Sequence, residues 1–421
     1  MANTFTKEEK VIFDNMLEGF NDACVISKNV AKFGADGQTA ERANDTIWRP
    51  VPYILSSQNR TVGSAVTADD VKQLAVPSTL GYKKNVSLNL TATEMRDQLQ
   101  EGRLAKAAAH RLASDINTSV RDVASLEGSI VVTKSTAASS YDDIAAIESA
   151  LNEQGVPEDM RYLALTTRDY NALAGDLAGR ETLNKKALDA YERSRIGLIA
   201  GFETFKIDAG KSITGAAGSG DTIDTTGSQV DYDPQSSEST TAGEVNVDNR
   251  TQQITVSNTT SVAAGDCFTI ADVESVHHIT KEATGQLKTF RVISVDSGTT
   301  MTISPPIIGA TGTPNDAQAQ YQNCSVTATS ATAAITYINT TTAGANPFWH
   351  YDSIEIMPGR YAVPSGQGVE VLRGTTDQGL ELVMGKSFSN STFTTLYTFD
   401  VFYGVTNLNP EMNGIALFGQ A

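Results

Sequence analysis

Apolar and polar positions recur along this chain with several different periods, and each period predicts a different element. Over residues 1–35 the apolar side chains follow the period of an α-helix, which predicts one amphipathic helix, ended by the Gly and Asp residues after Phe33. Asp14, Glu18 and Asp22 follow at i, i+4 and i+8, so an acidic stripe is expected on its polar face. The apolar face is expected to contain Ile12, Phe13, Met16, Leu17, Phe20, Ala23 and Cys24.

Residues 46–92 carry short alternating runs, such as TIWRPVPYIL and YKKNVSLNL, between turn residues. This pattern predicts a long, extended excursion of two strands. Pro50, Pro52 and Pro77 exclude a central strand, because proline cannot donate a ladder hydrogen bond. The excursion is also locally basic in an acidic molecule, through Arg49, Arg60, Lys72, Lys83 and Lys84.

Residues 93–127 give the strongest helix signal, since no proline occurs between Pro77 and Pro157 and Gly128 is a suitable stop. The length exceeds the usual ~11–12 residues, so a structural backbone helix is expected. One face is expected to be apolar, with Leu104, Ala108, Leu112, Ile116, Val120 and Val123, and the other polar, with Arg103, Lys106, His110, Asn117 and Arg121.

The second half of the chain changes character twice. Residues 131–222 alternate strand and helix patterns, as in SIVVT, YDDIAAIESALNEQG, RYLALTT, RDYNALAGDL and FETFKIDA. Residues 223–342 are rich in Ser, Thr, Gly and Asn, and their short strands between turns predict a small all-β barrel or sandwich. Residues 346–421 return to a mixed α/β pattern, so the β unit is interpreted as an insertion into a parent domain.

Charge and composition exclude several classes of protein. The net charge is −17, and the stretch from Asp221 to Ala345 holds thirteen Asp and Glu against four Lys and Arg, which disfavours sequence-specific nucleic-acid binding. No window approaches the ~18 apolar residues of a membrane span, and no signal-peptide pattern opens the chain, so synthesis in the cytosol is expected. Cys24, Cys267 and Cys324 are widely spaced, which predicts buried free thiols.

Candidate chemical sites are weak, and neither an enzyme, a cofactor nor a metal site is predicted. The GKS at Gly210–Ser212 lacks the glycine that a phosphate loop needs five residues earlier, where Phe205 stands. His277 and His278 are adjacent and would point to opposite faces of a strand, so exposed loop histidines are expected. The acidic residues Asp221, Asp224, Asp231 and Asp233 lack the pattern of a calcium loop and indicate a solvated segment.

Five longer motifs are distinctive: NDTIWRPV, AHRLASDINTSVRDVASLEGSIVVT, GEVNVDNRTQQITVS, NPFWHYDSIEI and FYGVTNLNPEMNGIALFGQ. Together they resemble the major capsid proteins of tailed bacteriophages and, among these, the coat proteins of the phage P-twenty-two type. The resemblance implies an α+β, HK-ninety-seven-like capsid fold with an inserted all-β barrel, the I-domain. Its parts would be an N-terminal arm (1–45), an E-loop with flanking strands (46–92), a P-domain spine helix (93–130), an A-domain and P-domain in two pieces (131–222 and 343–421), and the I-domain (223–342).

The resemblance also implies a shell of hexamers and pentamers, with a portal at one vertex, assembled with a scaffolding protein in the bacterial cytoplasm as a DNA-free precursor. Only about 45 residues precede the TIWRPV strand, so a separate scaffold is expected. The candidate contacts are Asp14, Glu18 and Asp22 for the scaffold; Arg49, Arg60 and Lys72 for neighbouring subunits; and Asp231, Asp233 and Asp248 in an acidic loop of the insert. Two alternatives stay open: an encapsulin-like nanocompartment and a bacterial surface protein.

Overall fold

The structure is a computed structural model that describes residues 7–33, 46–52, 55, 71–91, 98–179, 190, 192–207, 210–224, 229–241, 243–327, 332–361 and 371–420. The chain forms two compact units. The first comprises residues 1–47, 77–121 and 354–406, and the second comprises residues 48–76, 122–353 and 407–421. Both units are discontinuous in sequence, so each is closed by segments that lie far apart along the chain.

The first unit begins with helix α1 (Lys7–Ala23), followed by the 3-10 turn η1 (Ser27–Asn29) and strand β1 (Ala31–Lys32). The prediction of one helix over residues 1–35 is therefore wrong at its end. Asn117 accounts for the early stop: its amide donates to the Ala23 carbonyl at 3.0 Å and accepts from the Ser27 N–H at 3.3 Å. This contact across 90 residues replaces the hydrogen bonds that a continuing helix would make.

The sheet of the first unit has the order β1-β21-β24-β23-β22, with β4 also paired to β24. Strand β4 was expected within the two-stranded excursion, but it pairs antiparallel with β24 from Tyr82 opposite Tyr403 to Thr91 opposite Thr394. Its alternating half-buried and exposed residues suit a sheet with one covered face. The strands are β4 (Tyr82–Thr91), β21 (Ile354–Pro358), β22 (Val371–Thr375), β23 (Glu381–Ser389) and β24 (Thr394–Asn407).

Helix α2 (Gln98–Glu127) confirms the long helix that the periodicity predicts. Its apolar face is buried as expected, with Leu104 half-buried at the start and Ala108, Leu112, Ile116, Val120 and Val123 enclosed. The polar face departs from the prediction at two positions: Arg121 is buried, and Asn117 contacts the arm. The short pair β2 (Thr46–Pro50) and β3 (Ala75–Thr79) forms a separate two-stranded sheet.

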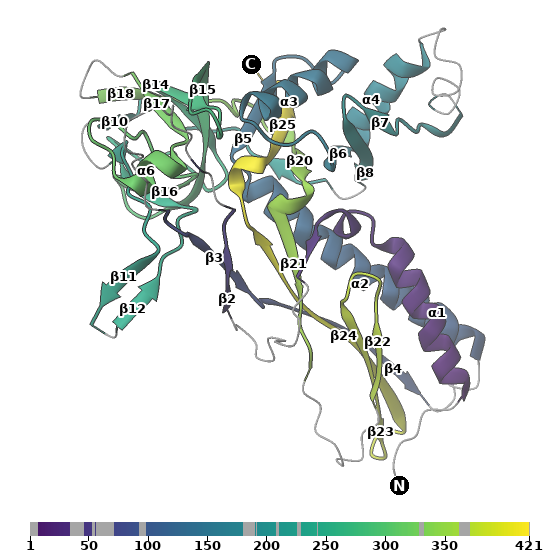
Figure 1. Ribbon diagram of the computed structural model, residues 1–421. Coiled ribbons are helices and arrows are strands. Elements are labelled where there is room, and N and C mark those ends of the chain that lie inside the picture. The colour runs from purple at the N-terminus through teal and green to yellow at the C-terminus, as the bar shows by residue number, and fades with distance from the viewer. Residues whose placement is uncertain are drawn as a thin grey trace, which may run out of the picture. The chain divides into compact units, whose positions relative to one another are not determined.

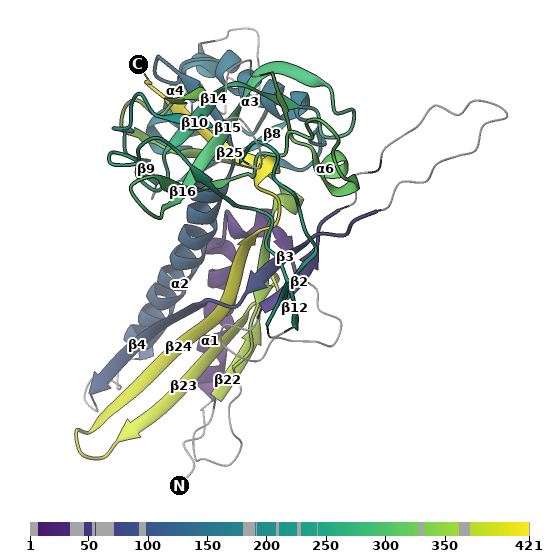
Figure 2. The same cartoon turned by 90° about the vertical axis from the view of Figure 1, so that its left-hand side faces the viewer.

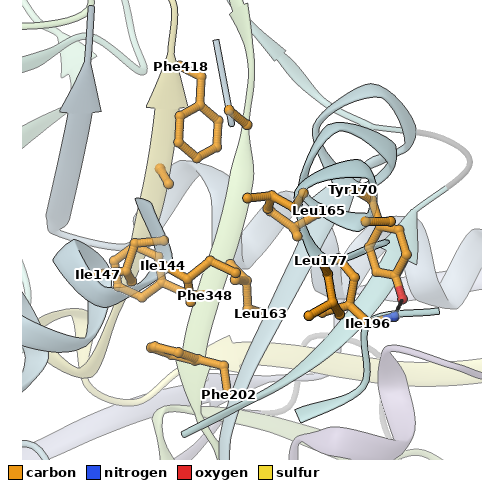
Figure 3. Close-up of a cluster of buried hydrophobic side chains, with 14 of the residues drawn as sticks. Ile144, Ile147, Leu163, Leu165, Tyr170, Leu177, Ile196, Phe202, Phe348 and Phe418 are labelled. Atoms are coloured by element: carbon orange, nitrogen blue, oxygen red, sulfur yellow. Dashed lines mark hydrogen bonds between the residues drawn. The ribbon is translucent and has the colours of Figure 1, made fainter. Parts of the chain in front are cut away.

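The second unit contains an α/β sheet of order β5-β25-β20-β6-β8-β7. Figure 3 shows its core, where Ile144, Leu163, Phe202 and Phe348 are fully buried and Tyr170 accepts a 2.8 Å hydrogen bond from the Ile196 N–H. The elements are β5 (Ile130–Lys134), α3 (Tyr141–Glu153), β6 (Arg161–Thr166), α4 (Thr167–Ala178), β7 (Leu198–Ile199), β8 (Phe202–Ile207), β20 (Asn346–His350) and β25 (Asn413–Phe418).

This sheet takes strands from both sides of the β-rich segment, because β20 lies between β25 and β6. The inserted position inferred from composition therefore agrees with the strand order. The expected α/β character of residues 346–421 is wrong, since the part that the structure describes contains only strands and the turns η4 (Tyr351–Ser353) and η5 (Pro410–Met412). Strands β9 (Ser212–Ile213) and β19 (Ala343–Gly344) pair where the insert leaves and rejoins the sheet.

The insert is a closed barrel with strands in the order β10-β18-β14-β15-β16-β13. It closes where Ile223 bridges to Val256 and the Ser257 N–H donates to the Thr222 carbonyl at 2.9 Å. Figures 1 and 2 show the barrel in two views. Its elements are β10 (Thr222–Asp224), β11 (Ser237–Thr240), β12 (Gly243–Asn246), β13 (Gln252–Thr255), β14 (Cys267–Val276), β15 (Ala283–Val295), β16 (Thr300–Ser304), α6 (Asp316–Tyr321), β17 (Cys324–Val326) and β18 (Thr332–Tyr337).

The barrel has a core of its own. Phe268 stacks on Phe290 with ring centroids 5.6 Å apart, and Ile270, Val292 and Met301 are fully buried beside them.

Cys24, Cys267 and Cys324 are buried and free, as the sequence predicts. Among the helices that the structure describes, none is long and apolar enough to cross a membrane.

Candidate assembly surfaces

Helix α1 is amphipathic in the predicted sense. Phe13, Met16 and Phe20 are buried, whereas Asp14 and Glu18 are exposed on the other side. Asp22 belongs to α1, but its side chain lies outside the described residues. The acidic stripe is therefore exposed at its first two positions.

A buried carboxylate fastens α1 to its own unit. Glu9 is 5% exposed and accepts hydrogen bonds from Lys386 and from the Tyr397 hydroxyl, the latter at 2.9 Å. The Lys386 ammonium also lies 5.7 Å from the centre of the Tyr397 ring. This contact was not predicted, although the sequence holds one signal for it: Glu9 precedes Phe13 by four residues, on the apolar face of the helix. A single charge at such a position is the signal of a buried ion pair.

The three basic residues predicted for the E-loop region have different surroundings in the part of the chain that the structure describes. Arg49 is half-buried on β2, and Lys72 has an exposed side chain. Arg60 lies outside the described residues. Their proposed contact with a neighbouring subunit stays a prediction.

The acidic candidates of the insert have partners inside the insert. Asp231 accepts from the Thr311 N–H at 3.2 Å and from the Thr311 hydroxyl at 3.0 Å. Asp233 accepts from the Asn315 amide at 2.7 Å. Asp248 pairs with the Arg250 guanidinium at 2.7 Å. These carboxylates are spread over separate contacts and form no single acidic cluster.

Further exposed acidic residues of this region lie on the hairpin β11–β12. All eight strand residues are exposed, with Glu238 opposite Val245 and Ser239 opposite Glu244. The two strands form a sheet of only two strands, and Figure 1 shows them projecting from the barrel. Two strands with no core are marginally stable in water. The hairpin is therefore the part of the insert best suited to gain order from a partner.

Three cations of the insert lie on the opposite kind of surface, the seam where the barrel meets the rest of the second unit. Lys288, 1% exposed, forms an ion pair with Glu411. Arg291 is fully buried and donates to the Ser125 carbonyl at the end of α2 at 2.6 Å. Arg250 reaches the Asn407 carbonyl at 2.8 Å. A helix C-terminus and a carboxylate both favour cations, so these groups match electrostatically.

A neutral histidine completes the polar cluster around Glu411. The Nε2 atom of His278 lies 3.9 Å from a carboxylate oxygen of Glu411, and its backbone N–H donates to the Gln154 carbonyl at 3.1 Å. Burial lowers the pKa of His278 to about 4, against the attraction of Glu411. Burial opposes ionisation of Glu411, but the buried Lys288 ammonium holds the pKa of this carboxyl below the usual value.

The expectation of exposed loop histidines is wrong, because both imidazoles are partly buried at the seam. A methyl group built at Gly155 would lie 2.7 Å from His277, so the glycine leaves room for this ring. Thr289 adds neutral hydrogen bonds to the seam, donating to the Ser129 carbonyl at 2.7 Å and accepting from the Val131 N–H at 3.3 Å.

Candidate chemistry is sparse. Within the described ranges, no group of three or more His, Cys, Asp or Glu side chains could hold a metal ion. The segment Gly210–Ser212 runs into strand β9 rather than into the helix that a phosphate loop requires. The features with clear physical roles are the exposed hairpin β11–β12, the exposed face of α1 and the buried seam.

A fastened arm, a long helix, a discontinuous α/β sheet and an inserted closed barrel define an α+β capsid protein of the HK-ninety-seven-like kind from a bacteriophage. The chain belongs to the P22 coat protein family, since the model of that family, described as P22 coat protein, gene protein 5, matches residues 1–419. The resemblance drawn from the motifs is confirmed. Family membership favours the coat-protein interpretation over the nanocompartment and the surface protein.

Solved structures give related matches. The capsid of the cyanophage P-SCSP1u is 10% identical over 90% of this chain and 85% of that chain, with a TM-score of 0.43. The I-domain of the CUS-3 coat protein is 38% identical over 29% of this chain and 98% of that chain, with a TM-score of 0.22. A virus-like particle from Pyrococcus furiosus is 8% identical over 96% of both chains, with a TM-score of 0.39.

Proposed function

We propose that this coat protein assembles with a separate scaffolding protein, in the host cytoplasm, into an icosahedral procapsid of hexamers and pentamers with a portal at one vertex. The procapsid expands on packaging and encloses double-stranded DNA. The observation that carries the proposal is the hairpin β11–β12, whose eight strand residues are exposed and form a sheet of two strands. Such an element gains a core only from another subunit.

The charge distribution supports a shell wall that does not bind its contents. The net charge is −17, and the four cations of the insert are directed into its seam or toward its own backbone. The remaining outer surface of the insert is acidic, which disfavours contact with packaged DNA. Arg49, Arg60 and Lys72 of the E-loop region are proposed to meet carboxylates of a neighbouring subunit.

The exposed carboxylates of α1 are the proposed contact for a basic helix of the scaffold. Asp14 and Glu18 project from a helix whose other face is buried, so they are available to a partner. Contacts between exposed charges are weak and screened by salt, which suits a partner that must leave before DNA enters.

Co-expression with a candidate scaffold tests the proposal. Electron microscopy and sedimentation should show closed, DNA-free shells of uniform size with the scaffold, and aberrant or few particles without it. A chain that stays monomeric under both conditions would contradict assembly. Uniform shells formed without any scaffold would contradict the requirement for that partner.

A further inference from the structure

The E-loop region is fastened at its base to the insert. The base consists of Val51 and residues 71–74, which flank the segment 53–70. Leu74 is 5% exposed and packs against Ile308 and Tyr321 of the insert, which are 4% and 9% exposed. Val51 and Tyr232 cover the edge of this small cluster. These contacts join two parts of the chain that are more than 200 residues apart.

Hydrogen bonds from helix α6 hold the same backbone on both sides of one residue. The Lys72 N–H donates to the Gln320 side-chain oxygen at 3.1 Å, and the Tyr321 hydroxyl donates to the Lys72 carbonyl at 3.0 Å. Within the base, the Val51 N–H donates to the Leu74 carbonyl at 2.9 Å. The Gln73 amide adds a 2.9 Å bond to the Val51 carbonyl. The two segments of the base are thus hydrogen-bonded to each other and to α6.

Helix α6 is itself held by the acidic loop of the insert. Asn315 caps its start by accepting from the Gln318 N–H at 2.8 Å, and Asp233 accepts from the Asn315 amide. The Gln318 side chain donates to the Asp231 carbonyl at 3.1 Å. Six residues make a helix too short to be stable alone, so these contacts fix its place. Asp231 and Asp233 therefore act on α6, inside the subunit.

We propose that the insert positions the base of the E-loop region: Ile308, Gln320 and Tyr321 form a socket that holds Val51 and residues 71–74 in one place. The E-loop region needs such a support, because its strands β2 and β3 form a sheet of only two. The idea deepens the proposed function, since it rests on the E-loop being an intersubunit contact. It gives the insert a second role beside its exposed hairpin.

Tryptic cleavage after Lys72 in the unassembled full-length subunit measures the socket directly. The protease needs an extended, released backbone, so cleavage reports the population in which residues 71–74 have left α6. The double variant Gln320→Ala with Tyr321→Phe removes both side-chain hydrogen bonds to Lys72 and keeps the aromatic ring. We expect cleavage after Lys72 about ten times faster or more, the effect of losing two hydrogen bonds of ordinary strength.

Tyr337→Phe is the matched control. Tyr337 lies in the same barrel and donates to Asp221 at 2.9 Å, but it does not contact the base of the E-loop. It should leave cleavage after Lys72 unchanged. Hydrogen exchange of β14 and β15 checks that the barrel of each variant is folded. Wild-type cleavage in a folded double variant would overturn the socket. The measurement uses free subunits, so its outcome is independent of whether the chain forms shells.

Discussion

Two sides of the inserted barrel differ in how they place their charged side chains. At the seam, Lys288 and Arg291 are almost fully buried and meet Glu411 and the end of α2. At the hairpin β11–β12, every strand residue is exposed, and the carboxylates of Glu238 and Glu244 face solvent. The seam is a buried polar interface within the subunit, whereas the hairpin is an exposed surface. The difference teaches that one module can carry its internal stability and its external contacts on separate faces.

The largest effect is expected from breaking the seam at Glu411. Glu411→Ala leaves the Lys288 ammonium buried without its carboxylate, and removing one partner of a buried pair costs about 3–5 kcal/mol of the free energy of unfolding. The double variant Lys288→Met with Glu411→Leu should recover most of that loss, because neither charge of the pair stays buried. Urea denaturation measures both. Equal losses in the single and double variants would show that the pair is not the reason.

The second largest effect is expected from acid, which should destabilise the seam. The folded protein keeps His278 neutral with a pKa of about 4, whereas the unfolded chain binds a proton near pH 6.5. The unfolded state therefore binds more protons between these values, so stability present above pH 6.5 falls as the pH drops toward 4, by up to about 3 kcal/mol. Glu411, whose pKa is lowered, adds a further loss below its ordinary value of 4.5.

Denaturation midpoints measured from pH 7 to 4 test this dependence. His278→Gln should flatten the slope between pH 6.5 and 4, while His110→Gln, on the exposed face of α2, should leave it unchanged. A slope that is the same in all three proteins would remove His278 from the explanation.

Charge reversal on the hairpin should alter assembly and leave the stability of the fold nearly unchanged, whereas the seam variants alter stability. Glu238→Lys with Glu244→Lys changes exposed side chains only, so the free energy of unfolding should stay within about 0.5 kcal/mol of the wild-type value. Shell yield or size should change, as measured by sedimentation and electron microscopy. Normal shells from this variant would remove the hairpin carboxylates from the assembly argument.

The smallest thermodynamic effect is expected on the arm. Asp14→Lys with Glu18→Lys alters two exposed positions, each worth about 0–1 kcal/mol in any single contact. We expect slower, less salt-sensitive assembly with scaffold and an unchanged unfolding curve. Asp142→Lys with Glu153→Lys, at two exposed positions of α3, makes the same change in net charge and is the control. Light scattering at several salt concentrations measures the rate, and a wild-type rate would mean that the stripe is only solvated.

Regular patterns in the sequence predicted the elements well. The α/β alternation located β5, α3, β6, α4 and β8, and the Ser- and Thr-rich composition located the barrel, because local periodicity reflects which face of each element is buried. The motifs identified the family. The end of α1 could not be predicted, since Asn117 determines it from 90 residues away.

The seam was also invisible in sequence. Lys288 and Glu411 are separated by 123 residues, and the residue type alone does not show whether a lysine is buried or exposed. The expected solvated acidic segment is wrong at Asp221, which is 3% exposed and accepts a hydrogen bond from the Tyr337 hydroxyl at 2.9 Å. Asp224 and Asp233 are exposed, as the sequence predicts. Composition predicts how much charge a module carries, but only the fold decides which charges remain outside.

The two-residue pairing of β9 with β19 has an evolutionary consequence. Ile213 lies opposite Ala343 and Ser212 opposite Gly344, so the chain departs and returns at neighbouring points. For the α/β sheet, the barrel is therefore equivalent to a short turn between two neighbouring points. The entropy cost of closing this long loop is small, because the folded barrel already holds its two ends together. Such a junction permits a gene to acquire, exchange or discard a module without redesigning its host, and it marks the place where a foreign domain could be grafted.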